Sequence, residues 1–232
     1  MIRRIKLLLV FGAMTLITAC GGGSSETTTT STVASTESFM LKAAIANALQ
    51  AGANNITING FMSGTAITGS GTVTRGTLSS GTFEGASLFQ QTTTSTIKIT
   101  VSGVTVPFND TTVEWYDSNY IPIGDSDGDE YTVVNGTPII PTTVKVNDTG
   151  ILYTANRYSD STKTTLLGNS SVSYVVQADT ATTALLKFIN KETDTNGDII
   201  IYTQLSRITP AGTNTLIKRT VEDSGDTINI IY

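Results

Sequence analysis

The densest group of possible metal ligands is an acidic run that contains Asp125, Asp127, Asp129 and Glu130. Calcium prefers several oxygen ligands at about 2.3 to 2.6 Å, and alternate carboxylates in a loop can supply them. The spacing departs from that of an EF-hand, because Glu130 stands where its glycine should fall and Gly136 where its bidentate glutamate should fall. We therefore assign no metal ligand and expect a solvated acidic turn, with calcium binding as the alternative.

Four aromatic residues near this run, Trp115, Tyr116, Tyr120 and Tyr131, could form a platform on which a sugar ring stacks, and Trp115, Tyr116 and Tyr120 are the candidate ligand-binding residues. On β-strands, aromatic side chains also fill cores and pair across the sheet, so a ligand-binding surface and a packed core both remain open. The neighbouring Glu114 and Asp117 could act as a glycosidase acid and nucleophile, which need carboxyl groups about 5 to 9 Å apart. Carboxylates at strand ends are common, and we assign no catalytic residue.

Composition excludes several kinds of chemistry. The chain has no histidine, and its one cysteine is Cys20. Ser-His-Asp and Cys-His nucleophilic sites, His or Cys zinc sites and disulfides therefore all lack a key group. We predict a protein that is not an enzyme and uses no cofactor. The formal net charge is −5, and no basic stripe follows residue 20, so nucleic acid is not an expected partner.

The first residues have the pattern of an export signal. A basic start is followed by an apolar run that ends at residue 19, too short to cross about 30 Å of hydrocarbon as a permanent helix. The tetrapeptide Ile17-Thr18-Ala19-Cys20 resembles the lipobox of bacterial lipoproteins. The resemblance implies that residues 1–19 are a signal peptide and that Cys20 is lipidated with diacylglyceride and palmitate. Because Gly21 is not the aspartate that retains enterobacterial lipoproteins at the inner membrane, the resemblance points to the outer membrane.

The rest of the chain divides into a tether and one domain. Residues 20–36 are expected to be the lipidated cysteine and a flexible tether, because the sequence GGGSSETTTTSTVAST is low in complexity and has no apolar period. Residues 37–232 are long enough for a single β-rich domain. An apolar stripe over residues 37–51 predicts one helix, with Thr36 as its N-cap and Gly52 as its stop.

After this helix, apolar and polar residues alternate with period two, which is typical of strands with one buried face. Asn196-Gly197 predicts a hairpin between residues 184–192 and 199–208. The next two turns are expected at Pro210-Ala211-Gly212 and Asp223-Ser224-Gly225. Similar breaks are expected at Asn59-Gly60, Ser80-Gly81, Asn109-Asp110, Asp148-Thr149-Gly150 and Gly168-Asn169-Ser170.

Strands joined by such short links should pair with their neighbours in the chain. We therefore predict a mainly β fold, an antiparallel meander that forms a curved sheet, half-barrel or barrel, with the one N-terminal helix covering an apolar face or plugging an open end. Arg157 and Lys187 are predicted to be inward-pointing charges on edge strands, where they would hinder sheet aggregation.

The order of helix and then meander is similar to that of the periplasmic lipoprotein-carrier half-barrels, whose concave face binds acyl chains. The stretch WYDSNYIP, which starts at Trp115, resembles uncharacterised β-rich lipoproteins of proteobacteria. These resemblances imply an envelope protein that is anchored to the membrane through its N-terminal lipid. We predict a non-enzymatic binding or structural component of the outer membrane. A lipid or lipoprotein carrier and a glycan-binding or glycan-active module are the alternatives.

Overall fold

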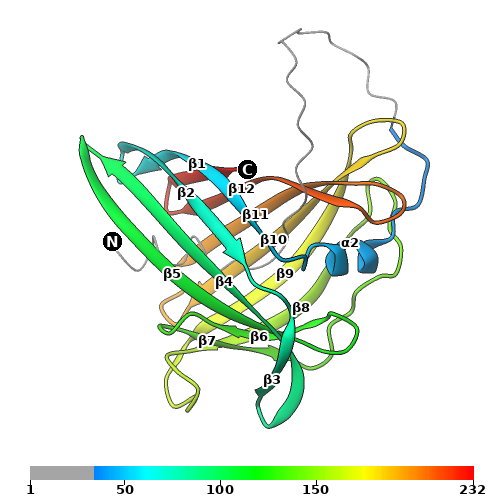
Figure 1. The fold of residues 1–232 in the computed structure, drawn as a ribbon, viewed down its shortest axis with the longest axis horizontal. Helices are drawn as coiled ribbons and strands as arrows, with labels where there is room; N and C mark the ends of the chain where they lie inside the picture. The colour runs from blue at the N-terminus through cyan, green and yellow to red at the C-terminus, as the bar shows by residue number, and fades with distance from the viewer. Residues whose placement is uncertain (1–33) are drawn as a thin grey trace, which may run out of the picture.

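A computed structural model describes residues 34–232, which form a closed antiparallel β-barrel with one short helix across an end (Figure 1). The predicted signal peptide, Cys20 and most of the predicted tether lie outside these residues. The elements, in chain order, are α2 (Leu41–Asn47), β1 (Gly52–Met62), β2 (Thr65–Arg75), β3 (Ser79–Phe83), β4 (Ala86–Val101), β5 (Val104–Tyr116), β6 (Pro122–Ser126), β7 (Tyr131–Asn135), β8 (Thr149–Tyr158), β9 (Leu166–Ala178), β10 (Ala184–Asp194), β11 (Ile199–Ile208), β12 (Asn214–Asp223) and β13 (Asp226–Ile231).

The ring closes because β1 pairs with both β2 and the last strand, β13. Strand β4 is long enough to serve two neighbours: residues 86–90 pair with β3, and residues 93–101 pair with β2. The result is a ring of twelve strands with β3 attached outside it. The predicted antiparallel meander is confirmed, and among the three predicted shapes the barrel is the one that forms.

The prediction that Arg157 and Lys187 lie on edge strands is wrong, because β8 and β10 each have a hydrogen-bonded neighbour on both sides. Arg157 does point inward and is buried. Lys187 alternates with the buried Leu186 and Phe188, so it lies on the outer face of the barrel.

Turn prediction succeeded for three hairpins and failed at several other positions. The predicted turns at Pro210-Ala211-Gly212 and Asp223-Ser224-Gly225 join β11 to β12 and β12 to β13, whereas the break predicted at Gly168-Asn169-Ser170 lies inside β9. The hairpin at Asn196-Gly197 joins β10 to β11 as predicted, with φ of +91° at Gly197. By contrast, Asn59-Gly60, Ser80-Gly81 and Asn109-Asp110 lie inside β1, β3 and β5. At Gly60 the physical reason is close packing: a Cβ there would lie 2.1 Å from the carbonyl oxygen of Thr227, so glycine lets β1 approach β13.

The helix is shorter than predicted. Phe39 exchanges two backbone hydrogen bonds with Val144, of 2.8 and 2.9 Å, and this bridge keeps the chain extended up to Met40. Met40 is therefore the N-cap, without a side-chain cap, and Thr36 does not cap the helix. Gly52 is the first residue of β1.

Polar side chains from the barrel wall hold the C-terminal end of α2. Gln91 donates from Nε2 to the carbonyl oxygens of Leu49 and Gly76, both at 2.8 Å. Arg75 donates to the carbonyl oxygen of Ala48, and Asn214 donates to that of Ala44 at 3.2 Å. The bonds to Ala48 and Leu49 satisfy carbonyl groups that the end of a helix leaves without partners, whereas the carbonyl oxygen of Ala44 also accepts the N–H of Ala48.

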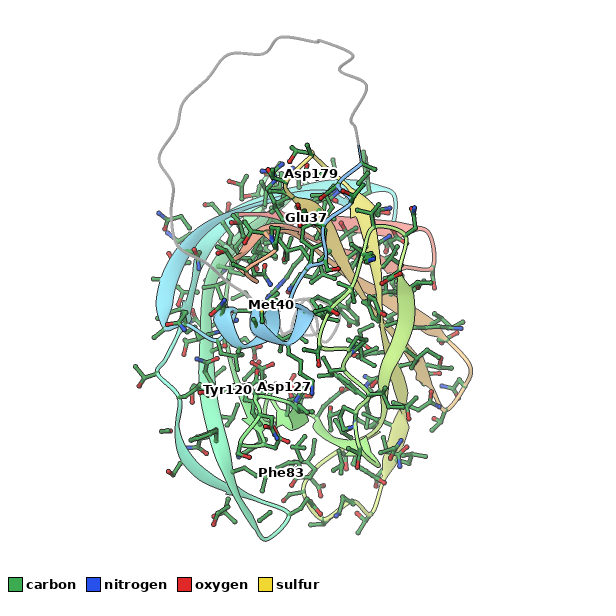
Figure 2. All side chains as sticks on the ribbon, turned by 90° about the vertical axis from the view of Figure 1, so that its right-hand side faces the viewer. Glu37, Met40, Phe83, Tyr120, Asp127 and Asp179 are labelled. Carbon is green, nitrogen blue, oxygen red and sulfur yellow. The ribbon has the colours of Figure 1, made fainter. Side chains whose placement is uncertain are left out.

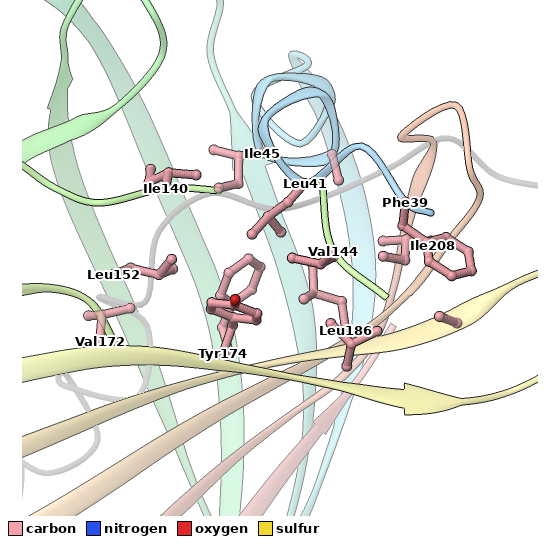
Figure 3. Close-up of a cluster of buried hydrophobic side chains, with 14 residues drawn as sticks. Phe39, Leu41, Ile45, Ile140, Val144, Leu152, Val172, Tyr174, Leu186 and Ile208 are labelled. Atoms are coloured by element: carbon pink, nitrogen blue, oxygen red, sulfur yellow. The ribbon is translucent and has the colours of Figure 1, made fainter. Parts of the chain in front are cut away.

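Two apolar clusters fill much of the interior. Beneath α2, Leu41 and Ile45 pack on side chains from β8 to β11 such as Tyr174 and Leu186 (Figure 3). The view along the barrel shows α2, marked by Met40, lying across this end (Figure 2). The second cluster covers the inner faces of β1, β2, β4 and β11 to β13, and includes Ile58 and Ile230. Elsewhere on the inner faces of β5 to β10, polar and charged residues such as Glu114, Arg157 and Glu192 replace apolar ones.

Candidate functional site

A polar cavity of about 80 Å³ lies inside the barrel against the inner faces of β5 to β11. Cross-strand register brings its charged residues together: Glu114 is opposite Asp125, Asp125 is opposite Thr132, and Thr132 is opposite Arg157. Residues in register on neighbouring strands share one face of a sheet. The lining consists of Glu114, Pro122, Gly124, Asp125, Glu130, Thr132, Val134, Tyr153, Arg157, Ser170, Val172, Asn190, Glu192 and Tyr202.

Arg157 on β8 joins two buried carboxylates of this lining. Its Nη2 donates to both carboxylate oxygens of Glu130, at 2.6 and 2.9 Å, and its Nε donates at 3.0 Å. Its Nη1 lies 3.1 Å from Oε2 of Glu192 on β10. Asn190 donates from Nδ2 to the other oxygen of Glu192 at 3.0 Å. The planar guanidinium has the fork geometry that such two-sided pairing needs.

The protonation of Glu192 is tuned by its surroundings. Burial disfavours the charged carboxylate and raises its pKa to about 7, while Arg157 and the hydrogen bond from Asn190 act in the opposite direction. The nearby carboxylate of Glu130 adds to the rise. Glu192 is therefore the lining group that changes charge close to neutral pH.

Glu114 and Asp125 form the opposite wall. Burial raises the pKa of Glu114, and the charge of Arg75 and a hydrogen bond with Tyr116 lower it in part. Burial, followed by the charge of Glu114, raises the pKa of Asp125 well above its usual value, against a hydrogen bond from Thr132. Both of these adjacent acids therefore resist ionisation, and for Glu114 burial outweighs the nearby charge of Arg75.

The four aromatic residues predicted as a ligand platform do not form one surface, although Trp115 and Tyr131 both lie against Phe83, with their ring centroids 6.4 Å apart. Trp115 faces outward beneath β3, where its ring stacks on Phe83 with centroids 4.6 Å apart. Tyr116 is buried on the inner face beside Leu49. Tyr120 lies in the turn before β6 and stacks on Phe89, with ring centroids 6.0 Å apart. Consecutive residues of a strand point to opposite faces, which separates Trp115 from Tyr116.

The residues of the acidic run have different partners and do not act as one group. Asp125 faces the cavity, and Glu130 pairs with Arg157. Asp127 accepts backbone hydrogen bonds from Asp129 and Glu130 at 2.9 and 2.8 Å, which shapes the turn between β6 and β7. Within residues 34–232 no group of three or more acidic residues is arranged to hold a metal ion. The geometry therefore gives the calcium alternative no support.

The pair Glu114 and Asp117 does not form a glycosidase arrangement either. Asp117 uses Oδ1 to accept the backbone N–H groups of Asn119 and Ile121, at 2.7 and 2.9 Å, and so organises the turn after β5. Glu114 points into the barrel and is in register with Asp125.

Sequence reasoning missed Asn190, Glu192 and Tyr202. A signal for the first two was present: in residues 184–192, Asn190 and Glu192 fall on the same alternating positions as Leu186 and Phe188. Polar residues on an otherwise apolar face indicate an internal polar site. Their common partner, Arg157, is on another strand and could not be identified from local pattern.

Comparisons with protein-family models, curated proteins and solved structures found no match to this chain. Among residues 34–232 no helix is both long enough and apolar enough to span a membrane.

Proposed function

We propose that this chain is a lipid-anchored protein of the bacterial outer membrane whose barrel binds a small polar ligand in its interior, without catalysing a reaction. The observation that carries the binding role is the charged cavity enclosed by β5 to β11. Charged groups in a barrel interior cost stability, because burial removes them from water. A cavity that retains four acidic residues and Arg157 is best explained by a ligand that interacts with them.

The size of the cavity limits the ligand. A volume of about 80 Å³ compares with on the order of 10 to 15 Å³ for one enclosed water, so a molecule of a few non-hydrogen atoms, or a small group of a larger one, fits. This favours a small-ligand role over the carrier alternative, because an acyl chain is much longer and gains nothing from a charged lining. The glycan alternative gains no support either, because Trp115 and Tyr131 pack around the buried Phe83 while Tyr116 and Tyr120 have other partners.

The anchoring role is supported by sequence alone. The lipobox-like tetrapeptide that ends at Cys20 and the low-complexity tether after it suit a domain held away from a bilayer. Two or more acyl chains, at about 0.8 kcal/mol for each buried methylene, would give stable attachment. Metabolic labelling with palmitate should mark the wild type and not Cys20→Ser. Equal labelling of the two would refute the anchor.

Binding can be tested separately by NMR on the expressed barrel. A panel of small polar compounds should contain members that shift the backbone amides of cavity-lining residues. Ser170→Leu, which places a larger side chain in the cavity, should abolish these shifts. Ser171→Leu is the matched control, because the adjacent residue lies on the outer face of the same strand. A panel in which no compound shifts the lining residues would refute the binding role.

A further inference from the structure

We infer that the ligand of this cavity carries a cationic nitrogen group, either an ammonium or a guanidinium, which binds between Glu114 and Asp125 on one wall and Asn190 and Glu192 on the other. The inference rests on the proposed binding role and names the chemical class of the ligand. It follows from the charges, the hydrogen-bonding groups and the geometry of the lining.

The lining has more acids than bases. Glu114, Asp125, Glu130 and Glu192 face the cavity, and Arg157 is the one lining residue with a basic side chain. Arg157 is committed to Glu130 and Glu192 through contacts of 2.6 to 3.1 Å. Asp125 therefore faces the space without a basic partner in the lining, and the basic groups that act on Glu114, Arg75 and Arg219, lie outside it. A positive ligand group would complement the two acids.

Two buried acceptor atoms of the lining that receive no hydrogen bond also favour a ligand with N–H donors. Oε2 of Glu114 and Oδ1 of Asn190 are shut off from bulk solvent and accept no hydrogen bond from the protein. Asn190 is itself 7% exposed. The nitrogen donors of two side chains nearby are already engaged, since Nδ2 of Asn190 donates to Glu192 and all three guanidinium nitrogens of Arg157 contact carboxylates. An occupant that supplies several N–H donors would satisfy the vacant acceptors.

A bare metal ion fits less well than an organic cation. Hard cations need several oxygens at one point, and within residues 34–232 no three acidic side chains converge on a common centre. An ammonium or guanidinium instead distributes its hydrogen bonds over acceptors that are set apart on different strands. Glu114 on β5 and Asn190 on β10 have this separation.

Protonation of the walls would be linked to binding. Glu114 faces Arg75, Arg219 and Tyr116, and burial leaves its pKa raised despite the two cations. Asp125 faces Glu114, Glu192, Asp127, Thr132 and Tyr153. Glu192 faces Arg157, Glu130, Asp127, Asn190 and Tyr202. A bound cation favours the ionised form of these acids, so its binding should release protons.

The test compares isosteric probes that differ in charge. Guanidinium and urea are both planar molecules of four non-hydrogen atoms, and ethylammonium and ethanol form a second pair. Each is titrated by NMR into the barrel at millimolar concentration and constant ionic strength, so that screening does not differ between samples. We expect the cation of each pair to bind at least about tenfold more tightly than its neutral partner.

Matched variants locate the effect. Glu114→Gln and Asp125→Asn keep the side-chain shape and should each weaken cation binding by about tenfold, leaving the neutral probes unchanged. Glu222→Gln on the exposed face of β12 is the control and should change neither. The heat of ethylammonium binding, measured in buffers of different ionisation enthalpy, should also show that protons are released.

The possible results separate the two proposals. Neutral probes that bind in the cavity as tightly as the cations would overturn the cationic ligand and leave the binding role intact. The same holds if acetate binds more tightly than ethylammonium. If no probe of either kind shifts the lining residues, the binding role itself is refuted.

Discussion

Arg157 and Glu130 form a forked ion pair inside the barrel, with three contacts of 2.6 to 3.0 Å between the guanidinium and the carboxylate. The two side chains are 6% and 5% exposed. Glu130 stands just before β7, and Arg157 is near the end of β8, so the pair locks together two strands that border the cavity. The site is therefore also part of what holds this wall of the barrel in place.

Replacing Arg157 with methionine should destabilise the barrel by about 3 to 5 kcal/mol, because Glu130 and Glu192 would be left buried without their common partner. Urea unfolding followed by circular dichroism measures the change. Arg207→Met is the control: its pair with Asp179 is at the surface, with an arginine side chain 49% exposed, and should contribute less than about 1 kcal/mol. A comparable loss in the two variants would contradict this account of the internal pair.

Stability should depend on pH through Glu192. Its folded pKa of about 7 is above the ordinary value of 4.5, so the folded state holds this proton more strongly than the unfolded chain does. The corresponding stabilisation is complete below about pH 4.5 and is lost as the pH rises through 7, a change of about 3 kcal/mol. Unfolding free energies measured across this range for wild type and Glu192→Gln should diverge in this direction. Parallel curves would show that Glu192 titrates normally.

Substitution of Gly124 should destabilise the barrel, because the Phe83 ring packs against the outer side of this residue. A Cβ at this position would be 2.3 Å from Cζ of Phe83 and 2.4 Å from the carbonyl oxygen of Thr132. Gly124→Ala should therefore displace the Phe83 ring from Trp115, at a cost of about 1 to 3 kcal/mol, and change the tryptophan fluorescence. Gly52→Ala is the control, since nothing lies within 4 Å of a Cβ there. Unchanged fluorescence in Gly124→Ala would contradict the packing.

Gln91 should stabilise the end of the barrel that α2 covers. Its Nε2 serves the carbonyl oxygens of Leu49 and Gly76, so Gln91→Leu leaves both buried acceptors unsatisfied and should cost about 1 to 3 kcal/mol. Amide hydrogen exchange in residues 41–49 should accelerate at the same time. The exposed Gln177, changed to leucine, is the control. Exchange that is equally slow in wild type and Gln91→Leu would rule out this anchoring role.

The sequence predicted the local features of the fold well. Alternation of apolar and polar residues identified strands such as β10 and β11, and Asn196-Gly197 identified their hairpin, because both depend on neighbours in the chain. The same signals could not tell a turn from a glycine required by packing, as at Gly60, where the reason is the carbonyl of Thr227. Closure of the ring was equally inaccessible, because it depends on the pairing of residues far apart in the chain.

The candidate site was harder to predict for the same reason. Asp125 and Glu130 attracted attention as a possible calcium loop, yet adjacent strands and a turn give them separate partners. Trp115 and Tyr116 were grouped by proximity in sequence, although a strand directs them to opposite faces. The three-way contact of Arg157, Glu130 and Glu192 joins positions from three strand regions, and no local spacing encodes it.

The pairing of β1 with β13 places Thr57 opposite Ile231, almost the full length of the domain away. Nearly the whole chain must therefore be present before the first strand can meet its second neighbour. Until then β1 and β12 expose unpaired backbone groups, which invite association between incompletely folded chains. Chaperones that shield such edges would be needed most during this interval, and contacts of such long range make slow maturation of the barrel the expected behaviour.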